Sequence, residues 1–195
     1  MHELQQPASN APSREWADGP VRETERLILR QDRPSDLEDR IAITSDPDFM
    51  RFVGGAYDRQ ENWSRLLRYI GHWDILGYGL LAVEELETGR YVGDLGVARF
   101  ERGLGDDFDN SPEAGWLIAE SASGLGYATE GVAAVMEWYE RFFGWSRFVC
   151  MIDPANEASL RVAAKIGFKP YREALNRGHP VLLHERMPAF PSGAE

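Results

Sequence analysis

The strongest constraint on the fold is a change of hydrophobic period about two thirds of the way along the chain. The segments 78–86, 91–100 and 113–119 have the length and composition of β-strands, and Glu87-Thr88-Gly89-Arg90 supplies a turn between the first two. From Val132 to Phe143, by contrast, the apolar residues follow the spacing of a helix that buries one stripe. A chain with this pattern must pack a long helix against a meander of antiparallel strands.

The other segments complete one α/β domain, expected over residues 21–190. Ser35 is the expected N-cap of a first helix, with Glu38 as its capping-box partner. Further helices are predicted at 62–73 and 159–166, and further strands at 24–30, 147–152, 171–174 and 181–187. The resulting order β-α-α-β-β-β-α-β-α-β-β predicts a mixed, mostly antiparallel sheet with helices on both faces. Residues 1–20 and 191–195 show no period and favour a loose arm and tail.

Composition narrows the possible partners. The formal net charge of -11 argues against nucleic acid, which binds basic surfaces. An acidic surface attracts cationic amines, or simply keeps the protein soluble. The one cysteine, Cys150, lies in an apolar run and reads as a buried strand thiol, and the absence of a disulfide framework favours the cytoplasm. Neither a secretory leader nor a membrane-spanning run is expected. His179 and His184 lack metal-ligand spacing, so no metal site is expected.

A glycine-rich turn, Ser123-Gly124-Leu125-Gly126-Tyr127-Ala128-Thr129, joins the meander to the long helix. Glycines let the backbone turn sharply and approach a ligand closely, and the unpaired amides of a first helical turn attract a pyrophosphate. The turn lacks the Gly-Lys-Ser/Thr ending of a P-loop, and it does not follow the first strand of a dinucleotide-binding unit. Taken alone it remains equally compatible with an ordinary strand-to-helix connection.

A second segment makes the pattern specific. Asp153-Pro154-Ala155-Asn156-Glu157-Ala158-Ser159 enters a helix that ends in Lys165-Ile166-Gly167-Phe168. In isolation, Asn156 or Ser159 would be read as a helix cap. Together with Thr24-Glu25-Arg26-Leu27, Glu113-Ala114-Gly115-Trp116-Leu117 and the glycine turn, the segment resembles the GNAT N-acetyltransferases, in particular their RimJ/RimL-like branch. The resemblance covers residues 21–187.

The resemblance implies acetyl-CoA as co-substrate and assigns its binding residues. The family's Arg/Gln-x-x-Gly-x-Gly/Ala motif falls on Ser123 to Ala128, and Ser123 departs from it because serine has no long cationic or amide side chain. The pyrophosphate is expected on the amides of Leu125, Gly126, Tyr127 and Ala128, with Thr129 completing the turn. The pantetheine arm is expected along Leu117, Ile118 and Ala119, and near Asn156 and Ser159.

The chemistry implied is direct attack of an amine on a thioester, which needs a base and a proton donor. Glu113, at the start of the expected fourth strand, is the candidate base, directly or through water, with Asp94 as the weaker alternative. The position at which many GNAT enzymes carry a tyrosine acid is Ala163 here, so Ser159 or water is the expected acid. A backbone amide near Leu117 or Ile118 is expected to polarise the thioester carbonyl.

The acceptor is less determined. A protein N-terminal amine, a small amine (polyamine, amino acid or aminoglycoside) and a non-catalytic acyl-CoA sensor all remain open, as does a homodimer. Phe52, Tyr57 and Trp73 are candidates for the acceptor pocket or for the core.

Overall fold

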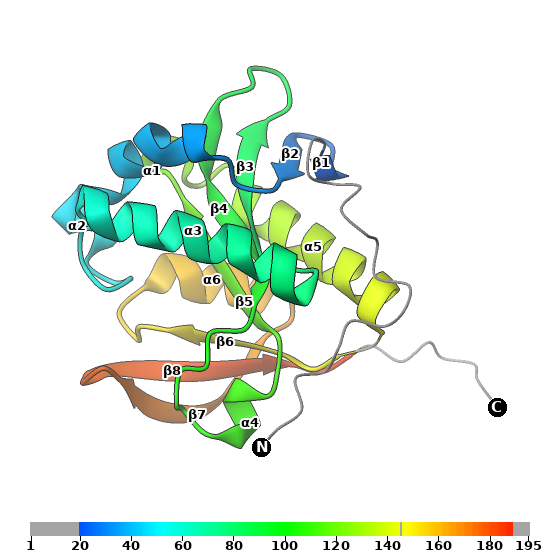
Figure 1. The fold of residues 1–195 in the computed structure, drawn as a ribbon. Helices are drawn as coiled ribbons and strands as arrows, with labels where there is room; N and C mark the ends of the chain where they lie inside the picture. The colour runs from blue at the N-terminus through cyan, green and yellow to red at the C-terminus, as the bar shows by residue number, and fades with distance from the viewer. Residues whose placement is uncertain (1–19, 145, 189–195) are drawn as a thin grey trace.

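A computed structural model describes residues 20–144 and 146–188 (Figure 1). The predicted tail at 191–195 and all but the last residue of the predicted arm at 1–20 lie outside these ranges. The strands are β1 (Pro20–Glu23), β2 (Leu27–Arg30), β3 (Leu80–Glu85), β4 (Tyr91–Ala98), β5 (Glu113–Ile118), β6 (Phe148–Ile152), β7 (Lys169–Asn176) and β8 (His179–Arg186). The α-helices are α1 (Leu37–Thr44), α2 (Pro47–Met50), α3 (Arg59–Leu76), α4 (Asp106–Asp109), α5 (Tyr127–Phe143) and α6 (Glu157–Lys165). Two 3-10 turns, Pro34–Asp36 and Glu120–Ala122, precede α1 and follow β5.

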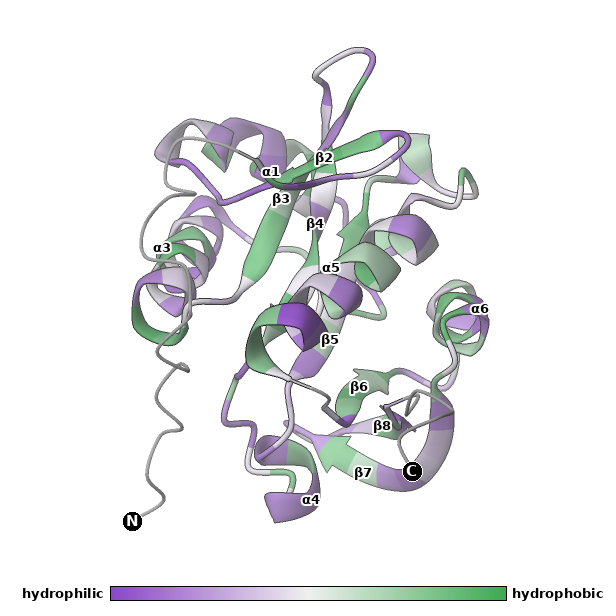
Figure 2. Ribbon diagram, turned by 90° about the vertical axis from the view of Figure 1, so that its right-hand side faces the viewer, coloured by the Kyte–Doolittle hydropathy of each residue, from purple (hydrophilic) through white to green (hydrophobic). Residues whose placement is uncertain are grey.

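The strands form one sheet in the order β1-β2-β3-β4-β5-β6-β8-β7. Every neighbouring pair is antiparallel except β5 and β6, which are parallel. The helices α1 and α3 lie on one face, while α5 and α6 lie on the other (Figure 2). The predicted fold class, a mixed and mostly antiparallel sheet with helices on both faces, is therefore confirmed.

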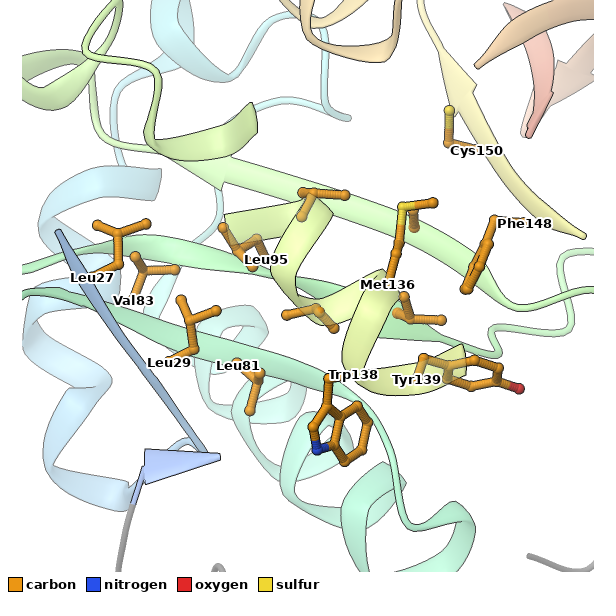
Figure 3. Close-up of a cluster of buried hydrophobic side chains, with 14 of the residues drawn as sticks. Leu27, Leu29, Leu81, Val83, Leu95, Met136, Trp138, Tyr139, Phe148 and Cys150 are labelled. Atoms are coloured by element: carbon orange, nitrogen blue, oxygen red, sulfur yellow. The ribbon is translucent and has the colours of Figure 1, made fainter. Parts of the chain in front are cut away.

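The main core lies between α5 and the sheet (Figure 3). Alternate residues of β3 face opposite ways, so Leu81 and Val83 pack toward α5, whereas Leu80 packs against Tyr69 of α3. The buried stripe of α5 contains the residues that the helical spacing marked, including Val132, Val135, Met136 and Tyr139.

Some local predictions were wrong. Ser35 does not cap a helix: Asp36 holds the N-cap position of α1, and no side chain caps that helix. The Asp36 carboxylate instead accepts from the amide of Arg33 at 2.7 Å and from the buried guanidinium of Arg30. Glu38 is exposed and pairs with Arg59 instead. The elements β1, α2 and α4 were not predicted from the sequence. These are elements of only four residues, too short to show a period.

Candidate active site

The site lies where the sheet divides. The strands β5 and β6 are paired in register at Glu113 and Val149 only, and the rest of β5 runs along an open edge. A cavity of about 570 Å³ borders this opening. Its lining includes four of the residues selected from the sequence as catalytic or coenzyme-binding, namely Glu113, Leu117, Asn156 and Ser159.

The direction of the backbone along β5 shows which groups face the opening. The amide of Ala119 donates to Val92 O at 2.8 Å, and a Cβ added at Gly93 would lie 2.0 Å from the carbonyl oxygen of Leu117. Both groups therefore point toward β4. Because successive residues of a strand direct their backbone groups to opposite sides, the amide and carbonyl of Ile118 point to the open edge. Of the three residues assigned to the pantetheine arm, Ile118 has the exposed backbone.

The glycine turn lies apart from the cavity, at the N-terminus of α5. Gly124 and Gly126 have φ of +79° and +87°, the left-handed conformation that glycine adopts at little cost. Gly126 is the N-cap, and no side chain caps the helix. The amides of Tyr127, Ala128 and Thr129 belong to the first turn and have no partner within the helix. Ser123, Gly124, Leu125 and Gly126 are exposed, so the turn is open to a ligand.

Arg26, which the motif comparison had not selected as a site residue, holds this turn in place. Its Nη1 donates to Leu125 O at 2.8 Å, and its Nε donates to the carboxylate of Glu130 at 2.8 Å. Glu130 also accepts from Thr24 Oγ1 at 2.6 Å. Partial burial alone would raise the pKa of Glu130, but these hydrogen bonds hold it below its ordinary value. Arg26 thus anchors the turn, and its own charge is paired with Glu130 at 2.6 Å. The contact joins residues a hundred positions apart, so no local pattern revealed it.

Glu113 is buried in the cavity wall, 5% exposed. Arg102 donates to both of its carboxylate oxygens, each at 2.7 Å. Burial raises the pKa of Glu113 and the Arg102 hydrogen bonds oppose it, with the balance above the ordinary value for glutamate. A carboxyl group with a raised pKa is a stronger base than an exposed one, which suits the role assigned to Glu113.

The sequence left open whether Asn156 or Ser159 caps α6, and the structure answers this. Asn156 is the N-cap of α6, and its Oδ1 accepts from the amide of Ser159 at 3.0 Å. Ser159 is not the cap, and within the described ranges no hydrogen bond ties its Oγ to another group. The hydroxyl therefore remains available on the cavity wall.

Residues 26–169 match the family model described as "Acetyltransferase (GNAT) domain". The chain belongs to the GNAT acetyltransferase family. The family and the enzyme class predicted from the motifs are confirmed.

Similar proteins span nearly the whole chain. The Bacillus subtilis (strain 168) protein YkkB is 30% identical over 180 residues, which are 84% of this chain and 93% of YkkB. A structure from Bordetella pertussis described as a GnaT-family acetyltransferase is 30% identical with a TM-score of 0.75, covering 85% of this chain and 98% of that one. RimL, named a ribosomal L7/L12 alpha-N-protein acetyltransferase and solved with coenzyme A, has a TM-score of 0.71 and covers 87% of this chain and 98% of its own. At 18% identity it shows the shared fold alone.

Among the remaining candidate site residues of this GNAT acetyltransferase, some line the cavity and some are held in buried structural contacts. Asp94 is buried and its carboxylate is committed to Arg40 and to the hydroxyl of Tyr91. Phe52 and Tyr57 line the cavity. Trp73 is a core residue, and its Nε1 donates to Leu80 O at 2.8 Å.

The described residues contain no cluster of three or more His, Cys, Asp or Glu side chains arranged to hold a metal ion. Within the same ranges, no helix has both the length and the apolar character needed to cross a bilayer.

Proposed function

We propose that this GNAT acetyltransferase moves an acetyl group from acetyl-CoA to a primary amine by direct attack in a ternary complex. The observation that carries the proposal is the open edge of β5, which runs beside a cavity containing both an acidic and a hydroxyl side chain. The residues present fit the coenzyme. The turn offers unpaired helix amides to a pyrophosphate, and the Ile118 backbone offers a donor and an acceptor to the pantetheine amides.

The coenzyme supplies an acetyl thioester, and the chain supplies the proton transfers. Glu113 takes a proton from the acceptor ammonium, directly or through water, so that the nitrogen lone pair is free to form the new C–N bond. The amide of Ile118 donates a hydrogen bond to the carbonyl oxygen as charge develops there. As the C–S bond breaks, Ser159 Oγ gives a proton to the sulfur and regains one from the nitrogen, which loses its second proton to become the neutral amide. Glu113 then releases its proton to solvent.

The test is an assay of the purified chain with acetyl-CoA and a panel of primary amines, in which both free thiol and acetylated product are measured. We expect stoichiometric thiol and N-acetyl product with at least one class of amine. Coenzyme binding without any amine-dependent thiol release would contradict the proposal and favour an acyl-CoA sensor.

Replacing Ser159 by alanine should reduce kcat by about tenfold or more while leaving the affinity for acetyl-CoA close to that of the parent, because a proton donor acts in the transition state. Steady-state kinetics and calorimetry measure the two effects. Ala158→Ser, on the neighbouring exposed position of α6, is the control for a changed helix surface. A fall in coenzyme affinity that accounts for the whole loss would mean that Ser159 only binds the coenzyme.

Cys150→Ala should retain turnover within about threefold, because a buried thiol is a poor nucleophile. Cys150 is 1% exposed, and burial, together with the nearby Glu113 carboxylate, raises the pKa of its thiol well above the ordinary value. Mass spectrometry of the parent incubated with acetyl-CoA alone should find no acetylated protein. An acetylated species that disappears in Cys150→Ala would replace direct attack by a two-step mechanism.

A further inference from the structure

Arginine is concentrated around the cavity of an otherwise acidic protein. The chain has a formal net charge of -11, yet the cavity lining contains six arginines, Arg40, Arg51, Arg65, Arg68, Arg102 and Arg177, against four acidic residues, Glu61, Asp94, Glu113 and Asp153. Such a reversal of charge marks the part of a surface where an anion is favoured.

Two of these arginines are already neutralised. Arg40 pairs with Asp32 and Asp94, and Arg102 is held by both oxygens of Glu113. Among the ion pairs of the described residues, Arg51, Arg68 and Arg177 have no carboxylate partner. Arg65 approaches Glu61 only to 3.9 Å, at the limit for an ion pair.

Aromatic rings fix the guanidinium groups without using their N–H donors. The Cζ of Arg65 lies 3.7 Å from the centroid of Tyr57, and its Nε is shielded from solvent with no hydrogen-bond partner among the described residues. Arg68 lies 5.4 Å from the ring centroids of both Tyr69 and Phe100. A guanidinium stacked on a ring keeps its edge free to bind carboxylate or phosphate in a bidentate way.

The same contacts place these cations close to the candidate base. The ring centroid of Phe100 lies 5.4 Å from the Cζ of Arg68 and 4.5 Å from the Cζ of Arg102. Arg102 in turn is ion-paired with Glu113. β7 and β8 are joined by the two-residue loop Arg177-Gly178, in which both residues have positive φ, as in a type I′ hairpin. This tight loop presents Arg177 at the cavity.

We propose that the acceptor is a small primary amine that also carries a carboxylate or a phosphate, bound by Arg65 and Arg68 with Arg51 and Arg177 at its outer side. The inference rests on the proposed function and gives its substrate class. The coenzyme's own pyrophosphate does not account for these arginines, because none of the residues 123–129 lines the cavity. Polyamines and aminoglycosides, which carry several positive charges, would be repelled by the same four arginines.

Pairs of amines that differ only in the anionic group test the proposal. The pairs are O-phosphoethanolamine and ethanolamine, glucosamine 6-phosphate and glucosamine, and glutamate and glutamine 1-amide. Spermidine, an aminoglycoside and an acidic N-terminal peptide complete the set. We expect kcat/KM to be about 100-fold higher for the anionic member of at least one pair, since two charged hydrogen bonds are gained. The phosphate and carboxylate pairs distinguish the two sources of charge.

Arg65→Gln and Arg68→Gln should each raise KM for the anionic amine by about tenfold and reduce the preference within the pair, because each removes one charged contact. Arg59→Gln is the matched control, since Arg59 lies on the same helix, is exposed, and is absent from this cavity. It should keep the parent preference. Equal rates within every pair, a preference for spermidine, the aminoglycoside or the peptide, or an unchanged preference in both arginine variants would each overturn the proposal.

A separate measurement covers the case in which no amine is acetylated and the proposed function fails. Calorimetry of the anionic amines with the protein loaded with coenzyme A then decides about the arginines alone. Binding that is lost in Arg68→Gln but kept in Arg59→Gln would support an anion site, whereas no binding of any anionic amine would overturn it.

Discussion

Replacing Gly126 by aspartate is expected to weaken acetyl-CoA binding by about 100-fold or more, because a negative charge about 4 Å from a phosphate costs about 4 kcal/mol near a protein surface. The backbone conformation at Gly126 can accommodate aspartate. Aspartate is a favoured N-cap and tolerates the left-handed conformation that Gly126 adopts at φ +87°, so the protein should fold. A Cβ at this position would lie 3.4 Å from the Nη2 of Arg26, a guanidinium that is already paired with Glu130.

Calorimetry with acetyl-CoA measures the effect, and circular dichroism confirms the fold. Gly126→Asn is the matched control, because asparagine has nearly the same shape and the same conformational tolerance without the charge. It should bind the coenzyme much more tightly than Gly126→Asp. Unchanged affinity in a folded Gly126→Asp protein would show that the pyrophosphate binds elsewhere.

Replacing Glu113 by glutamine is expected to lower the rate by about 100-fold or more, the range of a general base. The pH dependence of kcat/KM shows whether Glu113 acts as a base. Burial raises the pKa of Glu113 above that of an exposed glutamate, so the active carboxylate form is lost on acidification earlier than usual. The parent should therefore show an acidic limb in kcat/KM above about pH 4.3, the ordinary glutamate value, and the variant should lack it. Above this limb the loss should shrink as the pH approaches the pKa of the amine, because fewer protons must then be removed.

The ion pair with Arg102 requires a control. Glu113→Gln leaves a half-buried guanidinium without its carboxylate, which can distort the site for reasons unrelated to proton transfer. The double variant Glu113→Gln/Arg102→Gln removes both charges and should recover thermal stability without recovering activity. A loss by the same factor at every pH, or recovery of activity in the double variant, would assign Glu113 a positioning role.

The sequence predicted the sheet and its long helices because their apolar periods extend over many residues. It also located the glycine turn, since positive φ at two nearby positions needs glycine whatever the tertiary context. It failed where contacts between elements decide. At the start of the first helix, the Asp36 carboxylate binds Arg30 of β2 and no side chain caps the helix amides. In the same way, Arg26 reaches Leu125 and Glu130, and nothing in the neighbourhood of Arg26 reveals its partners.

The acceptor side was the least predictable part. Arg65 and Arg68 are ordinary helix residues in sequence, and Arg177 belongs to a turn. They become a charged site only because the sheet opens between β5 and β6 and the fold brings α3 and the β7–β8 loop to the same cavity. Net charge alone therefore left two interpretations, attraction of cationic amines or simple solubility, and neither indicated an anion site.

The division of the sheet has a consequence for how this protein can diversify. The groups assigned to the coenzyme and to proton transfer lie within one continuous stretch from Glu113 to Ser159, and Arg26 anchors the turn from outside it. The acceptor-facing arginines Arg51, Arg65, Arg68 and Arg177 come from segments before and after it. Mutation in the flanking segments can thus change which amine is accepted while the acetyl-delivering machinery is inherited intact. A comparison of paralogues should find sequence differences concentrated at α2, α3 and the β7–β8 loop, where selection for new substrates acts.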